Sequence, residues 1–183
     1  MKKTMNNLLL VPHDFTNVGD AALKHAVFVA QKRNAEIKVL HIVSDKSKIN
    51  EAEQKLNELI TQLNLSEIKI EPLVEIGSIF EEIGKIAENI GARLIIMGTH
   101  GARGMQKLFG SYAIKVIRST KIPFLVVQET DPPTQIKHIA VPIDLSKESL
   151  QIINVASEIA LTFGATIHIL AEKQTSTDLD LQI

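Results

Sequence analysis

Short apolar runs alternate with helical segments along most of this chain, and that alternation limits the folds it can adopt. Most of the runs are apolar on both faces, which is typical of strands in a parallel sheet that is covered on both sides. Strands of one parallel sheet are joined by right-handed crossovers, here the helical segments. The sequence therefore predicts a doubly wound α/β sheet over residues 7–128. The runs are Leu8–Val11, Ile37–Val43, Ile68–Ile76, Leu94–Met97 and Phe124–Val127.

The helical segments carry apolar stripes and end signals. Ser78 and Glu81 are spaced as a capping box at the start of the third helix. Lys32 and Arg33 suit the negative C-terminal end of the first helix. The stripes are Leu23, Ala26, Val27 and Ala30 in the first segment, Ala52, Leu56, Leu59, Ile60 and Leu63 in the second, and Ile79, Ile83, Ile86, Ala87 and Ile90 in the third.

The composition excludes several classes of site. The chain has 183 residues, 45% of them hydrophobic, enough for one well-packed domain and a remainder. Its 20 basic and 21 acidic residues give a net charge of −1. Nucleic-acid-binding domains usually carry an excess of basic residues, so the charge does not suggest that function. The absence of cysteine excludes disulfides and thiolate metal sites. Only four consecutive apolar residues precede Pro12, too few for a signal peptide or a membrane span, so we expect a cytoplasmic protein without nucleic-acid or membrane partners.

The chain contains an internal repeat. LLLVPHDF at 8–15 is matched by HIAVPIDL at 138–145, and NAEIKVL at 34–40 by GATIHIL at 164–170, both at an offset of 130 residues. We therefore expect a domain at 1–128, a linker at 129–136 that contains two prolines, and an incomplete second repeat of strand, helix and strand at 137–183. Asp144 repeats Asp14, but the second copy lacks a glycine loop, which favours a turn role for Asp144.

The second repeat is too short to stand alone. A strand–helix–strand fragment of fewer than 50 residues cannot easily bury both faces of its strands. Either it packs on the first domain or on another chain, or the polypeptide is a piece of a longer tandem protein. The sequence leaves these alternatives open.

A glycine-rich loop, MGTHGARGMQKLFGS, follows the fourth apolar run. Ligands of open α/β sheets lie at the carboxyl ends of strands, near the point where the strand order reverses. Glycines there can adopt positive φ and let backbone N–H groups approach an anion, and a helix N-terminus favours phosphate. The residues with this chemistry are Gly98, Gly101 and Gly104, the helix-opening Gly110 and Ser111, and Arg103 as a cation. The loop matches neither the P-loop nor the Rossmann glycine pattern, and a loop that merely turns the chain is the alternative.

Residues 7–128 as a whole resemble the universal stress protein family. The resemblance is carried by VPHDFT at the end of the first strand, VLHIVSD at the second, and GTHGARGMQKLFGS followed by IPFLVV at the end of the domain. It implies a five-stranded Rossmann-like sheet, dimerisation through the last strand, and ATP bound by the glycine loop. Any accompanying Mg²⁺ is held mainly by phosphate and water. The second copy resembles the tandem form of the family.

The resemblance also implies roles for individual residues. Asp14 faces the ribose or adenine, and the backbone around Ile42 receives the adenine edge. Gly98, Gly101, Gly110 and Ser111 bind the phosphates. The whole predicted binding set is Pro12, Asp14, Ile42, Met97, Gly98, Gly101, Arg103, Gly104, Gly110, Ser111 and Tyr112.

The loop departs from the family pattern in its spacing. ATP-binding members have G-x-x-G, nine residues and then G-[ST], whereas eight residues separate Gly101 from Gly110 here. One residue less shortens the reach of the loop by up to roughly 3.5 Å. Either Gly104 absorbs this change, or Ser111 is drawn away from the phosphates. Tyr112 stands where a smaller aliphatic residue is usual. The main hypothesis is an ATP-binding stress-response or signalling module. The alternative is a nucleotide-independent dimeric interaction protein of the same fold, whose site the shorter spacer has closed.

Three histidines, His13, His41 and His100, lie near the carboxyl ends of strands. Imidazoles suit zinc or nickel. The favoured interpretation is that His41 is a satisfied core group and that His13 and His100 orient loops, so no metal site is expected.

Asp14 is either a turn residue or a ligand. Thr16 or Asn17 is better placed as the N-cap of the first helix, which leaves Asp14 for the nucleotide.

No catalytic constellation is evident in the sequence. G-x-S-x-G is absent and no helix face pairs carboxylates at metal-ligand spacing, so we expect at most slow ATP hydrolysis. The short apolar strand Ile122–Val127 has Pro123 only at its beginning, and we expect a homodimer to form through this edge.

Overall fold

The computed structural model describes residues 7–99, 109–144 and 147–171. The chain divides into two compact units, Met1–Pro132 and Pro133–Ile183, each with its own sheet. The division falls inside the segment 129–136. The start of that segment is held to the first unit, because Asn17 Nδ2 donates to Glu129 Oε1 at 3.1 Å and Lys24 Nζ pairs with Asp131 at 2.7 Å.

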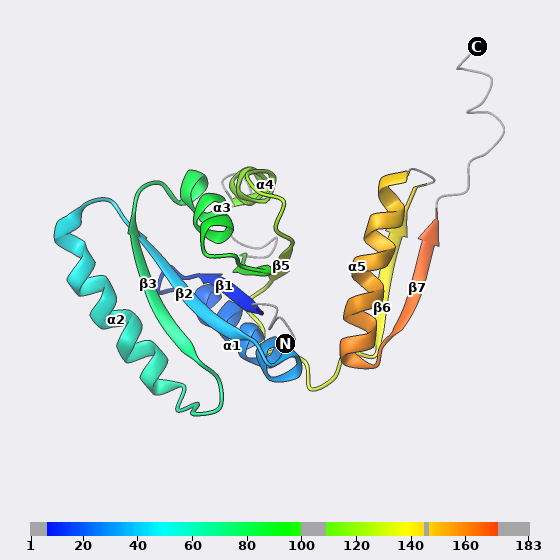
Figure 1. The fold of residues 1–183 in the computed structure, drawn as a ribbon, viewed down its shortest axis with the longest axis horizontal. Helices are drawn as coiled ribbons and strands as arrows, with labels where there is room; N and C mark the ends of the chain where they lie inside the picture. The colour runs from blue at the N-terminus through cyan, green and yellow to red at the C-terminus, as the bar shows by residue number, and fades with distance from the viewer. Residues whose placement is uncertain (1–6, 100–108, 145–146, 172–183) are drawn as a thin grey trace, which may run out of the picture. The chain divides into compact units, whose positions relative to one another are not determined.

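The first unit alternates strands and helices as the apolar runs predict (Figure 1). Its elements are β1 (Leu8–Pro12), α1 (Asn17–Arg33), β2 (Glu36–Val43), the 3₁₀ turn η1 (Lys46–Lys48), α2 (Ile49–Gln62), β3 (Ile70–Ile76), α3 (Ile79–Asn89), β4 (Leu94–Gly98), α4 (Phe109–Arg118) and β5 (Phe124–Val127). All five predicted strands are present, with ends that differ from the prediction by at most two residues.

The strands form one parallel sheet in the order β3-β2-β1-β4-β5. The chain first runs outward from β1 to β3 and then crosses back to place β4 on the other side of β1. Helices α1 and α2 pack on one face, and α3 and α4 lie together over the other (Figure 1). The prediction of a doubly wound five-stranded sheet is confirmed, and the strand order reverses between β1 and β4.

Successive residues of the central strands enter different cores. Leu10, Leu40 and Ile95 share a buried cluster with residues of α3 and α4. Their neighbours Leu9 and Val11 point to the opposite face, toward α1, and are equally buried. This double burial explains why the strands are apolar on both faces.

Helix α1 buries a slightly different stripe from the predicted one. Leu23, Ala26 and Ala30 are buried as expected, but Val27 is only half-buried and Val29 lies in the core. Val29 follows Ala26 by three residues, so the two share a face of the helix.

The helix ends follow most of the predicted signals. Thr16 is the N-cap of α1, and its side-chain oxygen accepts from the Gly19 N–H at 3.4 Å. Lys32 and Arg33 occupy the last turn of α1. Ser78 is the N-cap of α3, but its side chain makes no capping hydrogen bond, so the predicted capping box is not formed there. The first turn of α3 is instead closed by the backbone bond from Glu82 N to Ser78 O at 3.1 Å.

The second unit repeats the first three elements of the first unit. It consists of β6 (His138–Ile143), α5 (Lys147–Phe163) and β7 (Thr166–Ala171), with β6 and β7 parallel. The register His138↔Thr166 equals Leu8↔Glu36 shifted by 130 residues, so the repeat extends to strand pairing. The predicted partial βαβ repeat is confirmed.

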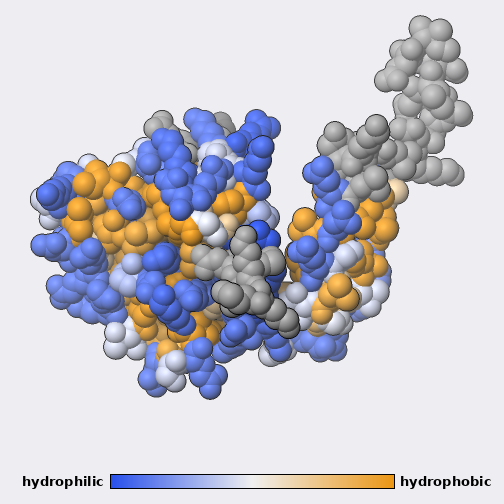
Figure 2. Space-filling model, in the orientation of Figure 1, coloured by the Kyte–Doolittle hydropathy of each residue, from blue (hydrophilic) through white to orange (hydrophobic). Residues whose placement is uncertain are grey.

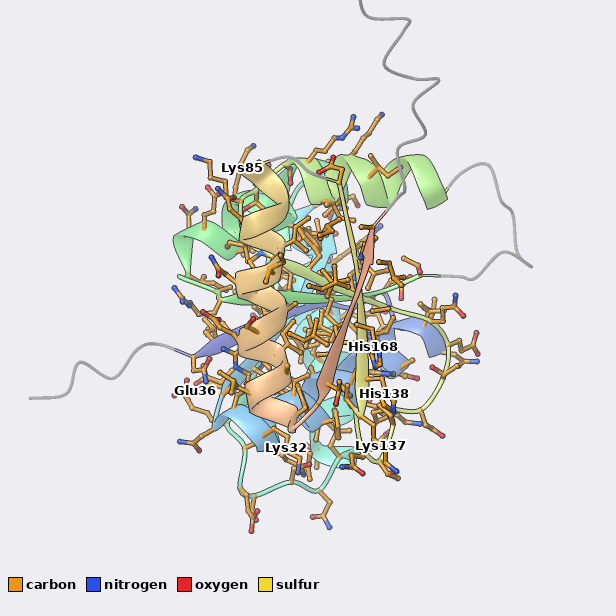
Figure 3. All side chains as sticks on the ribbon, turned by 90° about the vertical axis from the view of Figure 1, so that its right-hand side faces the viewer. Lys32, Glu36, Lys85, Lys137, His138 and His168 are labelled. Atoms are coloured by element: carbon orange, nitrogen blue, oxygen red, sulfur yellow. The ribbon has the colours of Figure 1, made fainter. Side chains whose placement is uncertain are left out.

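The second unit buries fewer apolar side chains than its counterpart. Ile169 and Leu170 are 54% and 56% exposed, whereas the equivalent Val39 and Leu40 are at most 1% exposed. Figure 2 shows apolar residues beside polar ones on its visible face. The described residues of the second unit form only two strands and one helix. In the first unit, β3, β4 and the other helices bury the equivalent side chains.

Candidate functional site

The candidate site lies at the carboxyl ends of β1 and β4, where the strand order reverses. Open α/β sheets bind ligands at this place because the loops from two neighbouring strands part there. Pro12 and Gly98 are the last residues of the two strands. Ile42 lies near the end of the adjacent β2, and its side chain and that of Met97 pack against the core cluster of α3 and α4. The structure thus brings Pro12, Ile42, Met97 and Gly98 to the same end of the sheet, the one formed by the carboxyl ends of its strands.

Asp14 lies in the turn between β1 and α1 and is exposed. Its Oδ1 accepts from the Thr16 backbone N–H at 3.2 Å and from the Thr16 hydroxyl at 2.6 Å. Asp14 therefore has the turn role that we weighed against a ligand role, and Thr16 has the capping role. Oδ2 takes no part in these two bonds, so the turn geometry and a ligand contact are compatible.

His13 is buried beneath this turn, with both ring nitrogens engaged. Nδ1 lies 3.0 Å from the Phe15 N–H, and Nε2 lies 3.1 Å from Asp20 Oδ1. Burial lowers the pKa of the His13 imidazole below its ordinary value, although the charge of Asp20 and its hydrogen bond act in the opposite direction. The prediction that His13 orients a loop is confirmed by its bond to Phe15.

His41, in β2, also belongs to this neighbourhood. Its Nδ1 is 2.7 Å from the His13 carbonyl oxygen, and its ring lies 4.4 Å from that of Phe15. Within the described ranges, no three histidine or carboxylate side chains are grouped closely enough to hold a metal ion. His100 lies outside those ranges.

The backbone conformation of Gly98 differs from the predicted one, and the structure gives a packing reason for a glycine at this position. We expected positive φ and a close approach to an anion, but Gly98 is not among the glycines with positive φ. A Cβ on Gly98 would instead lie 2.3 Å from the Val18 carbonyl oxygen. Helix α1 therefore packs directly on the end of β4, and the adjacent Thr99 N–H donates to Val127 O at 2.8 Å.

The rest of the predicted set is placed only in part. Gly110, Ser111 and Tyr112 lie in the first turn of α4, which confirms that a helix opens at this point of the sequence. Gly101, Arg103 and Gly104 lie outside the described residues.

Sequence reasoning missed Phe15 and Gly19 as parts of the site. Phe15 has a φ of 61°, which is unusual for a bulky residue. A Cβ on Gly19 would come 3.1 Å from Asp14 Oδ1 and from the His13 ring. The signal for Gly19 was available, because glycine is a poor helix former and its place in the first turn of a helix indicates a close approach.

Two hollows on the surface lie elsewhere. One of about 680 Å³ runs along the outer face of α2, and one of about 590 Å³ lies between α1, the end of α2 and residues 129–131. Neither is lined by Asp14 or Gly98, so neither is the candidate site. No helix in the described part of the chain has the length and apolar character that crossing a membrane requires.

The model of the universal stress protein family matches residues 5–128. The chain belongs to this family. Universal stress protein G of Shigella flexneri is 27% identical over 143 residues, which cover 68% of this chain and 100% of that protein.

Solved universal stress proteins share the fold. One from Archaeoglobus fulgidus is 28% identical, with a TM-score of 0.55 over 68% of this chain and 45% of that one. Another, solved in complex with cAMP, is 20% identical, with a TM-score of 0.56 over 69% of this chain and 100% of that one. The family assignment rests on residues 5–128 and therefore concerns the first unit.

Proposed function

We propose that this universal stress protein is a cytoplasmic nucleotide-binding module of the stress response, and that ATP binds between the ends of β1 and β4. The observation that carries the proposal is the convergence of Asp14 and Gly98 at the reversal point of the sheet. The cAMP complex of a protein with this fold supports a nucleotide as the ligand class.

The chemistry of the placed residues suits the parts of ATP. The exposed carboxylate of Asp14 is an acceptor for ribose hydroxyls or for the adenine amino group. The first turn of α4, with Gly110 and Ser111, offers backbone N–H groups and the positive end of a helix dipole to phosphates. In this proposal ATP biases the protein toward one of two conformational states and thereby selects its partners, which requires different affinities for the two states.

ATP with Mg²⁺ is expected to stabilise the protein against thermal unfolding. At 100 times Kd, one-site binding adds about 2.7 kcal/mol to the free energy of unfolding. Asp14→Asn keeps an oxygen for Thr16 but removes the charge and half of the acceptors, so we expect most of this stabilisation to be lost. Differential scanning fluorimetry with and without millimolar ATP·Mg²⁺ measures both effects.

Asp131→Asn is the matched control. Its side chain is 81% exposed and pairs with Lys24, so the same substitution there should leave the ATP effect unchanged. A wild-type protein that ATP·Mg²⁺ does not stabilise would contradict the proposal and favour the nucleotide-independent interaction protein.

We further propose that the chain forms a homodimer through β5. This strand is one of the two edges of the sheet, and Val126 on it is 44% exposed. Ile114 and Ile117 on the preceding α4 are 49% and 38% exposed. An apolar edge strand next to exposed isoleucines is a suitable surface for pairing with a second copy.

Val126→Asp is expected to convert the dimer into a monomer, because it places a charge at the centre of the paired edge. Light scattering after size-exclusion chromatography measures the mass. Ile76→Asp is the control, since Ile76 lies on the opposite edge strand with a similar exposure of 47%. A monomeric wild type at micromolar concentration, or equal dissociation by both variants, would refute the assignment of this interface.

A further inference from the structure

His13 is the one buried polar residue in the described part of the chain, at 4% exposed. Its backbone N–H donates to Leu40 O at 2.8 Å and extends the pairing of β1 with β2. Its carbonyl oxygen accepts from His41 Nδ1 at 2.7 Å. The backbone of His13 is thus fixed to β2, and its side chain reaches both the following turn and α1.

The partners of the ring determine which nitrogen carries the proton. The Phe15 backbone N–H can only donate, so Nδ1 of His13 must present its lone pair. The proton of the neutral ring is then on Nε2, which donates to Asp20 Oδ1. The site therefore selects the neutral Nε2–H tautomer.

The bond from Phe15 to His13 holds a costly backbone conformation. Phe15 has a φ of 61°, and the left-handed region is sterically unfavourable for a bulky residue. Asp14 lies between the two bonded residues, so the direction of its carboxylate depends on the same turn. Gly19 allows the turn and α1 to approach this closely, since a Cβ there would meet both Asp14 and His13 at 3.1 Å.

We propose that His13 is a positioning residue for the nucleotide site, and that its neutral ring holds the 13–16 turn in the conformation that presents Asp14 to the ligand. This inference rests on the proposed nucleotide binding. It adds a specific regulation, because protonation of Nδ1 removes the acceptor for the Phe15 N–H and releases the turn.

The regulation has a definite sign. The titratable groups around the ring are Asp20 on α1, Asp14 in the turn and His41 on β2. Burial is the largest influence and lowers the pKa of His13 below its ordinary value, so the ring is neutral at pH 7.5 and gains a proton at lower pH. Nucleotide affinity therefore falls as the pH drops through this lowered pKa, and the site is most competent above it.

Two variants separate the two hydrogen bonds. Asn Oδ1 occupies the position of His Nδ1 and accepts from Phe15, whereas Gln Nε2 occupies the position of His Nε2 and donates to Asp20. Isothermal titration with ATP·Mg²⁺ at pH 7.5 is expected to give near wild-type affinity for His13→Asn. For His13→Gln we expect about tenfold weaker binding, since the turn loses its acceptor. Circular dichroism at the same temperature establishes that both variants are folded.

The double variant and the pH profile test the mechanism. His13→Gln is expected to have little further effect in an Asp14→Asn background, because its influence passes through Asp14. Between pH 7.5 and 5.5, the wild type should lose more affinity for ATP than His13→Asn does. The His13→Asn variant is the control, because its pH dependence comes only from ATP and from the other groups of the protein.

The outcomes distinguish the two proposals. The role of His13 is overturned if the wild type binds ATP and the Asn and Gln variants bind it with equal affinity. It is also overturned if the wild type and His13→Asn have identical pH profiles. Both results leave the proposed ATP site unchanged. No ATP binding by the wild type overturns both.

Discussion

Gly98→Ala is expected to lower the free energy of unfolding of the first unit by about 3 kcal/mol and to abolish nucleotide binding. The new Cβ would lie 2.3 Å from the Val18 carbonyl oxygen and 2.4 Å from Val18 Cγ1. The first atom belongs to the backbone of α1 and cannot rotate away, so the helix must move from the end of β4. Overpacking of this kind costs about 1–3 kcal/mol, with the upper end expected against backbone. Urea unfolding of the full chain measures the loss.

Gly91→Ala is a suitable control for the loss of a glycine. A Cβ on Gly91 meets nothing within 4 Å, but its φ of 69° makes alanine strained by about 1 kcal/mol. We therefore expect the Gly91 variant to be less destabilised and to keep its affinity for ATP·Mg²⁺. If Gly98→Ala is no less stable than Gly91→Ala, the direct packing of α1 on β4 is incorrect.

The fold was predictable because its two strongest constraints are local. Runs such as Leu8–Val11 are apolar on both faces, which indicates a parallel sheet that is covered on both sides, and all four residues are buried. Stripes such as Ala52 and Leu56 occur at helical spacing and are buried in α2. The spacing of apolar residues reflects which side chains are buried, so the helices, the strands and their layers can be predicted from it.

The sequence was enough to propose a position for the candidate site, but not to predict the contacts around it. The glycine loop follows the fourth strand, and the proposed site lies at the carboxyl end of that strand, β4. The predicted positive φ of Gly98 was wrong. Its close approach to Val18, eighty residues earlier in the chain, produces no periodic pattern in the sequence. The tautomer of His13 was equally hidden, since it depends on Phe15 and Asp20, which surround the ring only in the folded state.

Ile95→Ala is expected to lower the free energy of unfolding of the first unit by about 2–5 kcal/mol, the usual range for truncation of a buried isoleucine. Ile95 is 0% exposed and lies in the middle of the sheet, level with Leu10 on β1 and Phe124 on β5. Its side chain belongs to the cluster that joins α3 and α4 to the strands. A cavity there removes contacts from both helices and from the β1–β4 pair, at whose end the proposed site lies.

Ile76→Ala removes the same atoms at the end of the edge strand β3, where the side chain is 47% exposed. We expect this variant to lose less than about 1 kcal/mol, because most of the deleted surface already faces water. Urea midpoints of the full-length variants, with hydrogen exchange of peptides from Met1–Pro132 to assign the transition, measure the difference. The proposed binding of ATP to the folded unit predicts that saturating ATP·Mg²⁺ raises the midpoint of Ile95→Ala as well. Equal midpoints for the two variants would mean that the centre of the sheet is not the stabilising core on which the β1–β4 site depends.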